Sequence, residues 1–330
     1  MIRLPERWNG GLVVGGTPGN RRQYSLDRAV SDWVLGHGYA FAATDKGNTG
    51  SGFYEDGTGP GDAVVEWNDR VTQLTRAARA AVTTYYGRRP ARTLMTGLSN
   101  GGYLVRWQLE NHPELYDGGV DWEGTLWRPD GPNLFTYLPV ALREYPLYAA
   151  TGDTEAHAAM LRAGLAAGSE FLWPYHYAVY WGLTQRIYRE EFDPGYTGDD
   201  ADYDYASRPE AVHDAVARVS LTGRIGKPLF TVHGTLDSLL PIATDSDLYA
   251  RMVDEQHRGA MFRYYRIGDG NHVDGLYDTY PDRLRPILPC YRTAFTAMEG
   301  WLDHRAAPPP STTVPRPASG DVVNSCSLSG

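Results

Sequence analysis

Residues 92–107 read RTLMTGLSNGGYLVRW, and the rest of the chain can be interpreted outward from this stretch. The short apolar and β-branched run Thr93–Thr96 predicts a strand, which ends in the sequence Gly97-Leu98-Ser99-Asn100-Gly101. An amphipathic run that starts at Gly102 predicts a helix. The stretch therefore predicts a strand, a sharp turn that carries a serine, and a helix.

The residue types at this turn suit a reactive serine. Bulky side chains two residues before or after Ser99 would clash with the flanking strand and helix, and Gly97 and Gly101 remove that clash. The turn lifts the Ser99 hydroxyl above the sheet. It also points the unpaired N–H groups of the helix N-terminus at whatever Ser99 attacks. A strand, G-x-S-x-G and a helix in this order are typical of a nucleophile elbow.

The bulk properties of the chain exclude several classes of function. The chain has 330 residues with a net charge of -9, which argues against nucleic acid and anionic membrane surfaces as partners. No apolar run approaches the length of a membrane span. No motif indicates a metal or an organic cofactor. We therefore expect a small-molecule or oligomeric ester as the partner.

A glycine-rich loop follows the first buried strand. The strand Leu12–Val14 opens into Gly15-Gly16-Thr17-Pro18-Gly19. Glycine lets backbone N–H groups approach a developing oxyanion to hydrogen-bond distance. We predict an oxyanion hole formed by the N–H of Asn100 together with that of Gly16 or Thr17.

The candidate acid follows a late strand, residues 228–232. Asp237 lies in the loop directly after it, where the acid of a catalytic triad is expected. Asp245 and Asp247 are the nearby alternatives, but their position in or near the next helix predicts that they face solvent. Asp121 is a further alternative after an earlier strand.

The candidate base follows the last predicted strand, residues 261–267. His272 lies there in a glycine-rich loop. His233, directly at a strand end, more plausibly makes a structural hydrogen bond. The chain order Ser99, Asp237, His272 is the order of an α/β-hydrolase triad, in which the histidine is the base and the aspartate orients it.

These assignments predict an α/β class with the α/β-hydrolase fold, a mostly parallel central sheet flanked by helices. We expect the catalytic domain to comprise residues 1–122 and 218–305. A largely helical, aromatic-rich lid is expected at 123–217, because the alternation of strand and helix stops there. A Pro-rich tail is expected at 306–330.

The lid and the loop after the third strand supply the candidate substrate contacts. Asp45 could face the cleft or form an ion pair with Lys46 that shapes its loop. Aromatic side chains are abundant in and near the lid, which favours a cleft for ring-bearing groups. The predicted contacts are Asp45, Trp122, Trp173, Tyr177 and Trp181.

Two further features concern stability and ions. Cys290 and Cys326 are the only cysteines, and a bridge between them would hold the tail down, although a pair of free thiols is the alternative. The acidic stretch 193–207 has carboxylates that could bind calcium, but their spacing is not that of an EF-hand. A solvated surface loop is the better interpretation of that stretch.

The chain also resembles known families. It is similar to secreted actinobacterial α/β-hydrolases of the tannase/feruloyl esterase type and to 3-hydroxybutyrate oligomer hydrolases. The resemblance implies ester hydrolysis by Ser99, Asp237 and His272, and secretion with a signal peptide outside the given chain; a cytoplasmic location is the alternative. Its segments are RLPERWNGGLVVGG at 3–16, TDKG at 44–47, YYGRRPARTLMTGLSNGG at 85–102 and HGTLDSLLP at 233–241.

The chain departs from the tannase pattern at two positions. Tannase-type enzymes have a cysteine directly before the serine and another directly before the histidine, and here these are Leu98 and Asn271. We expect a serine esterase for aryl or phenolic-acid esters, as in feruloyl esterases. The alternatives are a hydrolase of 3-hydroxyalkanoate oligomers or other aliphatic esters, a serine peptidase, and a non-catalytic binding protein of the same fold.

Overall fold

A computed structural model describes residues 1–19, 22–48 and 59–329. Eight strands of this part form one sheet in the order β1-β3-β2-β4-β5-β6-β7-β8. β1 pairs antiparallel with β3, and every other pair is parallel. The strands are β1 Ile2–Arg3, β2 Gly11–Gly16, β3 Ala40–Ala43, β4 Arg92–Leu98, β5 Gly118–Trp122, β6 Leu229–Gly234, β7 Phe262–Ile267 and β8 Thr312–Val314.

The register of the parallel strands brings their carboxyl ends to one edge of the sheet. Gly16 at the end of β2 pairs with Gly97 of β4, and Leu98 pairs with Trp122 at the end of β5. Gly234 at the end of β6 pairs with the last residue of β7. The loops after these five strands therefore meet at the edge where ligands of α/β proteins bind.

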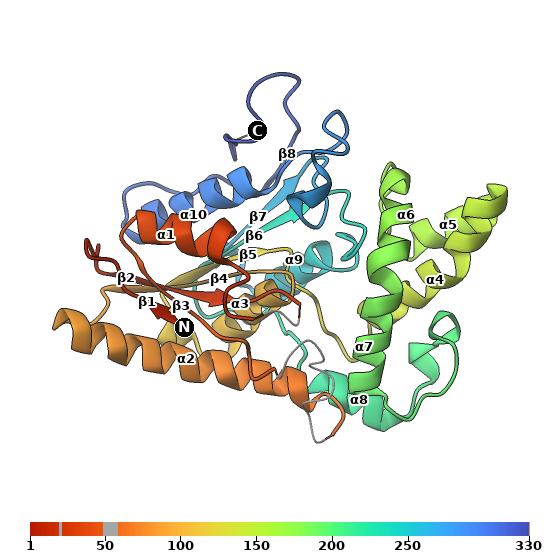
Figure 1. The fold of residues 1–330 in the computed structure, drawn as a ribbon, viewed down its shortest axis with the longest axis horizontal. Helices are drawn as coiled ribbons and strands as arrows, with labels where there is room; N and C mark the ends of the chain where they lie inside the picture. The colour runs from red at the N-terminus through yellow and green to blue at the C-terminus, as the bar shows by residue number, and fades with distance from the viewer. Residues whose placement is uncertain (20–21, 49–58, 330) are drawn as a thin grey trace.

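Helices cover both faces of the sheet (Figure 1), because successive strand residues point to opposite faces. Val13 packs with α1 and α10 in one buried cluster, whereas its neighbours Leu12 and Val14 pack with α2 and α3 in another. The flanking helices are the π-helical turn η1 Asp27–Ser31, α1 Asp32–Gly36, α2 Asp62–Tyr86, α3 Asn100–Asn111, α9 Ser246–Glu255 and α10 Leu288–Leu302.

The chain between β5 and β6 is helical and stands at one end of the sheet (Figure 1). We call residues 123–217 the helical segment; its first residue, Glu123, directly follows β5 and remains at the sheet edge. Trp127 packs against Tyr188 and Phe192, so the segment has an aromatic core of its own. Its longer elements are α4 Leu134–Thr151, α5 Thr154–Arg162, α6 Trp173–His176, the π-helical turn η5 Tyr177–Trp181, α7 Gly182–Phe192 and α8 Glu210–Ala217.

Short 3-10 turns and the tail complete the described structure. Residues of the Pro-rich tail form β8, which adds a parallel strand beside β7. No helix in the described ranges is both long and apolar enough to span a membrane. The 3-10 turns are η3 Pro113–Leu115, η4 Glu170–Leu172, η6 Asp200–Asp202, η7 Tyr205–Ser207, η8 Gly259–Met261 and η9 Asp274–Leu276.

Candidate active site

Ser99 forms the link between β4 and α3. Its backbone has φ +59° and ψ -122°, and its N–H donates to the carbonyl of Trp122 at 2.9 Å. A Cβ on Gly97 would overlap the backbone of Gly101, so the turn requires glycine at these positions. The serine is half-buried at the wall of a cavity. This is the strained turn that the sequence predicts for a nucleophile.

The glycine-rich loop after β2 packs directly against this turn. Gly16 and Gly101 are in contact backbone to backbone, and a Cβ on either residue would overlap the other. The buried Lys46 holds the loop from behind, because its Nζ donates to the carbonyl of Thr17 at 2.9 Å and also to that of Gly19. Burial lowers the pKa of Lys46 to about 7, against the opposing effect of the Asp45 charge. The loop is therefore fixed beside the N-terminus of α3.

Asp237 and His272 meet across the ends of β6 and β7. His272 Nδ1 lies 2.8 Å from Asp237 Oδ2, and both side chains are buried. Asp237 Oδ1 accepts the N–H groups of Leu239 and Leu240, each at 2.8 Å. Although burial raises the pKa of Asp237, the His272 charge and the hydrogen bond from His233 hold it well below its usual range. Asp237 is therefore the ionised acid of the cluster.

The Asp237 contact sets the tautomer of His272. A carboxylate only accepts, so the proton of the neutral ring is on Nδ1 and Nε2 carries the free lone pair. His272 and Ser99 line the same cavity. An imidazole with a free Nε2 beside a serine hydroxyl can act as its general base.

His233 supports Asp237 from the opposite side. Its Nε2 lies 3.0 Å from the carbonyl of Leu240 and 3.1 Å from Asp237 Oδ2, and since both groups accept, Nε2 is protonated. Its Nδ1 lies 2.6 Å from Ser246 Oγ. His233 thus makes structural hydrogen bonds, as the sequence indicates for a histidine at a strand end.

One group of three described residues has the proximity that a metal site needs. Glu123, His233 and Asp237 each offer a ligand atom within 4.8 Å of the others. The contacts of Asp237 with His233, His272 and two backbone N–H groups already occupy its oxygens. The group therefore fits a hydrogen-bonded cluster that orients His272 better than it fits a metal centre.

The expectation that Asp245 faces solvent is wrong. Asp245 is buried and accepts from Arg106 Nη1 at 2.9 Å, and Asp121 accepts from Arg106 Nε at 2.6 Å. The guanidinium also donates to Ser246 Oγ at 2.6 Å. Asp247 lies nearer the surface and accepts from Arg266 at 2.7 Å. None of these three aspartates replaces Asp237, because each is engaged with an arginine.

The cavity at Ser99 has a volume of about 280 Å³. The helical segment forms much of its wall, and aliphatic side chains predominate over the two tyrosines. Thr125 also lies on the wall, and its Oγ1 donates a hydrogen bond to Asn100 Oδ1 at 3.0 Å. The lining residues are Pro18, Gly19, Leu98, Ser99, Asn100, Thr125, Leu134, Tyr180, Leu183, Thr184, Ile187, Tyr188, Leu239, Leu240, His272 and Val273.

The five predicted substrate contacts lie outside this lining. Trp122 packs on Tyr291, and Trp173 packs on Tyr148. Tyr177 is partly exposed beside Tyr145.

The remaining two predicted contacts also make internal interactions. Trp181 is buried and donates from Nε1 to the carbonyl of Ser238 at 2.6 Å, which joins the helical segment to the acid loop. Asp45 accepts from the N–H of Gly47 at 3.2 Å and so shapes its own loop. The rings that the composition suggested for ligand binding are used largely for packing.

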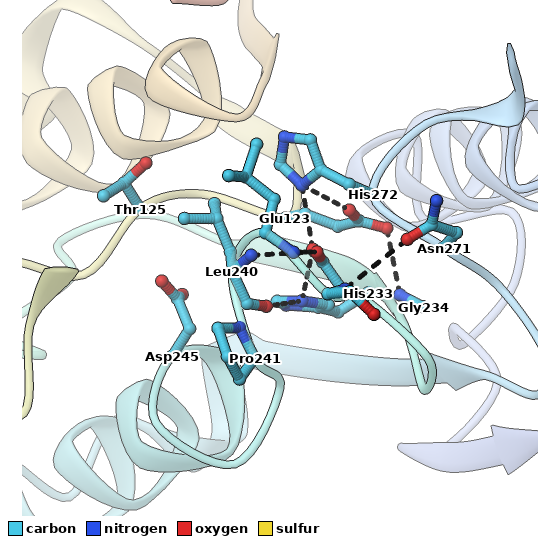
Figure 2. Close-up of polar contacts among 12 residues, drawn as sticks. Glu123, Thr125, His233, Gly234, Leu240, Pro241, Asp245, Asn271 and His272 are labelled. Carbon is cyan, nitrogen blue, oxygen red and sulfur yellow. Dashed lines mark hydrogen bonds and ion pairs between the residues drawn. The ribbon is translucent and has the colours of Figure 1, made fainter. Parts of the chain in front are cut away.

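The sequence did not predict the contacts that two residues close to the site make. Glu123 follows β5 and brings its Oε2 within 3.1 Å of His272 Nδ1 (Figure 2). The sequence feature that could have identified Glu123 is its position directly after a strand that ends at the ligand-binding edge. Lys46 also follows a strand at this edge, but its contact with the loop at Thr17 depends on how the two strands pair.

A disulfide joins Cys290 of α10 to Cys326 of the tail, with 4.9 Å between the Cα atoms. Thr293 Oγ1 of α10 donates to the Cys326 carbonyl at 3.0 Å. Together with β8, these contacts attach the tail to the sheet domain.

Comparison with known proteins gives a family match. The family model described as 3HB-oligomer hydrolase matches residues 154–329. A D-(-)-3-hydroxybutyrate oligomer hydrolase from Azoarcus sp. (strain BH72) is 29% identical over 110 residues. That match covers 31% of this chain and 16% of the relative, so the chain spans a small part of that protein's length.

Solved structures show the same fold at low sequence identity. Feruloyl esterase B from Aspergillus oryzae superimposes with a TM-score of 0.61 at 14% identity, covering 92% of this chain and 77% of that one. Tannin acyl hydrolase from Aspergillus niger gives 0.56 at 14% identity, covering 93% and 76%. These likenesses, with the sheet order, confirm the predicted α/β-hydrolase fold.

Proposed function

The chain belongs to the 3HB-oligomer hydrolase family, and on that premise we propose that it is a serine esterase acting on esters of short aliphatic hydroxy acids. The observation that carries the proposal is the 2.8 Å contact between His272 Nδ1 and Asp237, on a cavity that also contains the Ser99 turn. This arrangement supports nucleophilic catalysis with His272 as the base.

The proposed reaction proceeds through an acyl-enzyme. Nε2 of His272 takes the proton of Ser99 as its Oγ attacks the acyl carbon, and Asp237 stabilises the imidazolium. The backbone N–H of Asn100, with that of Gly16 or Thr17, holds the oxyanion; one such donor is worth roughly 3 kcal/mol of the barrier. The imidazolium then protonates the leaving alcohol. Water hydrolyses the acyl-enzyme with the same histidine as base.

The cavity wall supports an aliphatic acyl group. Leu134, Leu183 and Ile187 come from the helical segment, and Leu239 and Leu240 come from the acid loop. Such a wall favours each buried methylene by about 0.8 kcal/mol. The volume of about 280 Å³ suits a small acyl unit rather than a large fused ring. We propose that residues 123–217 act as a lid that selects the acyl group.

Aryl esters are the second candidate substrate. Tyr180 and Tyr188 lie on the cavity wall, and their rings could stack on a phenolic acid. A panel of matched nitrophenyl and methyl esters decides between the two classes. We expect 3-hydroxybutyryl and butyryl esters to have at least tenfold higher kcat/KM than feruloyl esters; the reverse order would transfer the proposal to aryl esters.

A fluorophosphonate probe tests the serine chemistry itself. We expect the wild-type protein to be labelled at Ser99, and Ser99→Ala to lose both labelling and turnover while it keeps its thermal unfolding transition. Absence of labelling in the folded wild type would overturn every serine-hydrolase interpretation. A folded wild type without any labelling would instead fit a binding protein of this fold.

The disulfide supports an oxidising compartment, and we propose that the protein is secreted. Disulfides persist mainly outside the cytosol. Loss of unfolding stability on reduction of the Cys290–Cys326 bond would support this location. An unchanged unfolding transition would remove that support.

A further inference from the structure

Glu123 has a conformation that the neighbouring strands impose. It is the first residue after β5 and has φ +54°, in the left-handed region that a side chain like Glu rarely adopts. Its N–H donates to the carbonyl of Val232 in β6 at 2.9 Å, and its side chain is fully buried. Left-handed conformations of this kind cost about 1–3 kcal/mol and concentrate at functional sites. In this conformation the side chain is buried and reaches the end of β6.

The carboxyl group of Glu123 reaches the far nitrogen of the base. Oε1 accepts the N–H of Gly234 at 3.0 Å, and Oε2 lies 3.1 Å from His272 Nδ1. Asp237 Oδ2 approaches the same nitrogen at 2.8 Å and makes the aligned hydrogen bond, whereas Glu123 Oε2 makes no such bond to the ring and is within hydrogen-bonding reach of the Asp237 side chain when Glu123 is protonated. Figure 2 shows Glu123 beside His272, with His233 on the other side of the cluster. Two carboxyl groups thus face one N–H.

The negative charge of this pair belongs to Asp237. Asp237 accepts from two backbone N–H groups and from both histidines, whereas Glu123 accepts from one backbone N–H. Burial and the Asp237 charge raise the pKa of Glu123 well above its usual range. Two buried carboxyl groups this close together would repel each other if both were ionised, so the pair carries one negative charge.

We propose that Glu123 is a positioning residue for His272: a protonated carboxyl that donates to Asp237 and that becomes the acid when the Asp237 charge is removed. The proposal rests on the serine esterase function proposed above. In the intact enzyme Glu123 keeps its proton throughout the cycle, so a single negative charge faces the imidazolium. A second charge there would over-stabilise the imidazolium and retard return of its proton to the leaving alcohol.

Glu123→Gln tests whether the residue is neutral. Glutamine keeps the acceptor for Gly234 and a donor for Asp237, so we expect kcat to fall by less than about threefold. The midpoint of the acid limb of kcat/KM should move by less than about 0.3 pH units. Loss of a charged neighbour this close to the ring would lower that midpoint by more than about one unit, and such a shift would overturn the proposal.

Glu191→Gln is the matched control. Glu191 is a second, largely buried glutamate that accepts a backbone N–H, from Ala63 at 2.8 Å, and it lies at the end of α7 against the start of α2. Its variant should leave the acid limb in place. Comparison of the two variants therefore removes any general effect of replacing a buried glutamate.

The second test removes Asp237. We expect Asp237→Asn to regain at least tenfold in kcat/KM from pH 6 to pH 9, relative to wild type, as Glu123 ionises and takes over Nδ1. The double variant Asp237→Asn/Glu123→Gln should show no such gain. Equal profiles for the single and double variants would overturn the proposal.

Labelling by a fluorophosphonate distinguishes a failure of the serine esterase function from a failure of the role proposed for Glu123. A wild type that is not labelled at Ser99 would overturn the serine esterase function. A labelled, active wild type whose Glu123 variants behave against expectation would overturn only the role of Glu123.

Discussion

The cavity has two sides that are built differently. On the sheet side, Glu123, Asp237 and His272 are buried polar groups at the ends of three parallel strands, and each bonds to another or to backbone. On the helical side, the wall is mainly aliphatic, with Leu183 and Ile187 as examples. The difference teaches that the groups of the proposed reaction belong to the sheet edge, whereas the proposed selection of the acyl group is assigned to the wall supplied by the helical segment.

Two hydrogen bonds join the helical segment to the acid loop. Trp181 donates to the carbonyl of Ser238, and Tyr137 donates to that of Leu239 at 3.2 Å. Otherwise the aromatic side chains of the helical segment pack largely on one another. These two hydrogen bonds fix the cavity wall against the loop that carries Asp237.

The largest expected effect is on the sheet side. At pH 6, Asp237→Asn should lower kcat/KM by about 10⁴, as in the triad of serine proteases, because the ring loses its orienting charge. Steady-state hydrolysis of a butyryl ester measures this loss.

Asp245→Asn, on the same side of the cavity, should lower stability rather than catalysis. It removes a buried partner of Arg106, so we expect the free energy of unfolding to fall by about 3 kcal/mol, with kcat of the folded enzyme nearly kept. Urea unfolding and activity below the transition test both statements. A large loss of kcat in this variant together with an active Asp237→Asn would exchange the roles of the two aspartates.

A smaller effect is expected on the helical side. Leu183 lines the cavity and is 49% exposed, so Leu183→Trp should narrow the entrance. We expect kcat/KM for hexanoyl esters to fall about tenfold relative to acetyl esters, while fluorophosphonate labelling of Ser99 persists. A chain-length series of nitrophenyl esters gives the ratio.

Val179→Trp provides the control for that change. Val179 is 42% exposed, precedes Leu183 by one helical turn, and is not a lining residue. Its variant should keep the wild-type ratio. The same altered ratio in both variants would show that the cavity wall does not set acyl selectivity.

The last expected effect is on stability alone and concerns Lys46 behind the glycine-rich loop. Its pKa is lowered to about 7 by burial, whereas the unfolded chain keeps it near 10.5. Between these values the unfolded state binds more protons, so this group makes the protein more stable as pH rises, by up to about 1.4 kcal/mol per pH unit. Relative to Lys46→Met, the wild type should therefore gain stability from pH 7 to pH 9 in urea unfolding.

Lys227→Met serves as the control, since Lys227 is partly exposed and outside the cavity. A wild-type slope that matches that of Lys46→Met would contradict the titration of Lys46 in this range.

The local elements around Ser99 could be predicted from the sequence. The predicted strand, Ser99 turn and helix correspond to β4 and α3, and the fold class is confirmed. Glycine spacing and strand-end position are local signals, which is why they could be interpreted without a structure. Asp237 and His272, expected from their loops, are brought to 2.8 Å of each other.

The sequence did not predict which side chains pair with each other or which line the cavity. Asp245 looked like a surface residue of a helix, because its partner Arg106 is 139 positions away in the chain. The aromatic residues of the helical segment looked like ligand contacts, since composition does not distinguish a ring that packs inside from one that lines a cavity. Trp173 and Trp181 are buried in the segment instead.

The sequence by itself determined the order of strands and helices, the Ser99 turn and the loops that carry an acid and a histidine, because these depend on spacing and on glycine. Only the tertiary structure decided which charges pair and which side chains line the cavity. Pairing depends on the register of parallel strands, which places Glu123, Gly234 and His272 together from distant parts of the chain. The Ser99 turn was thus encoded locally, whereas the proximity of a second carboxyl group to His272 was not.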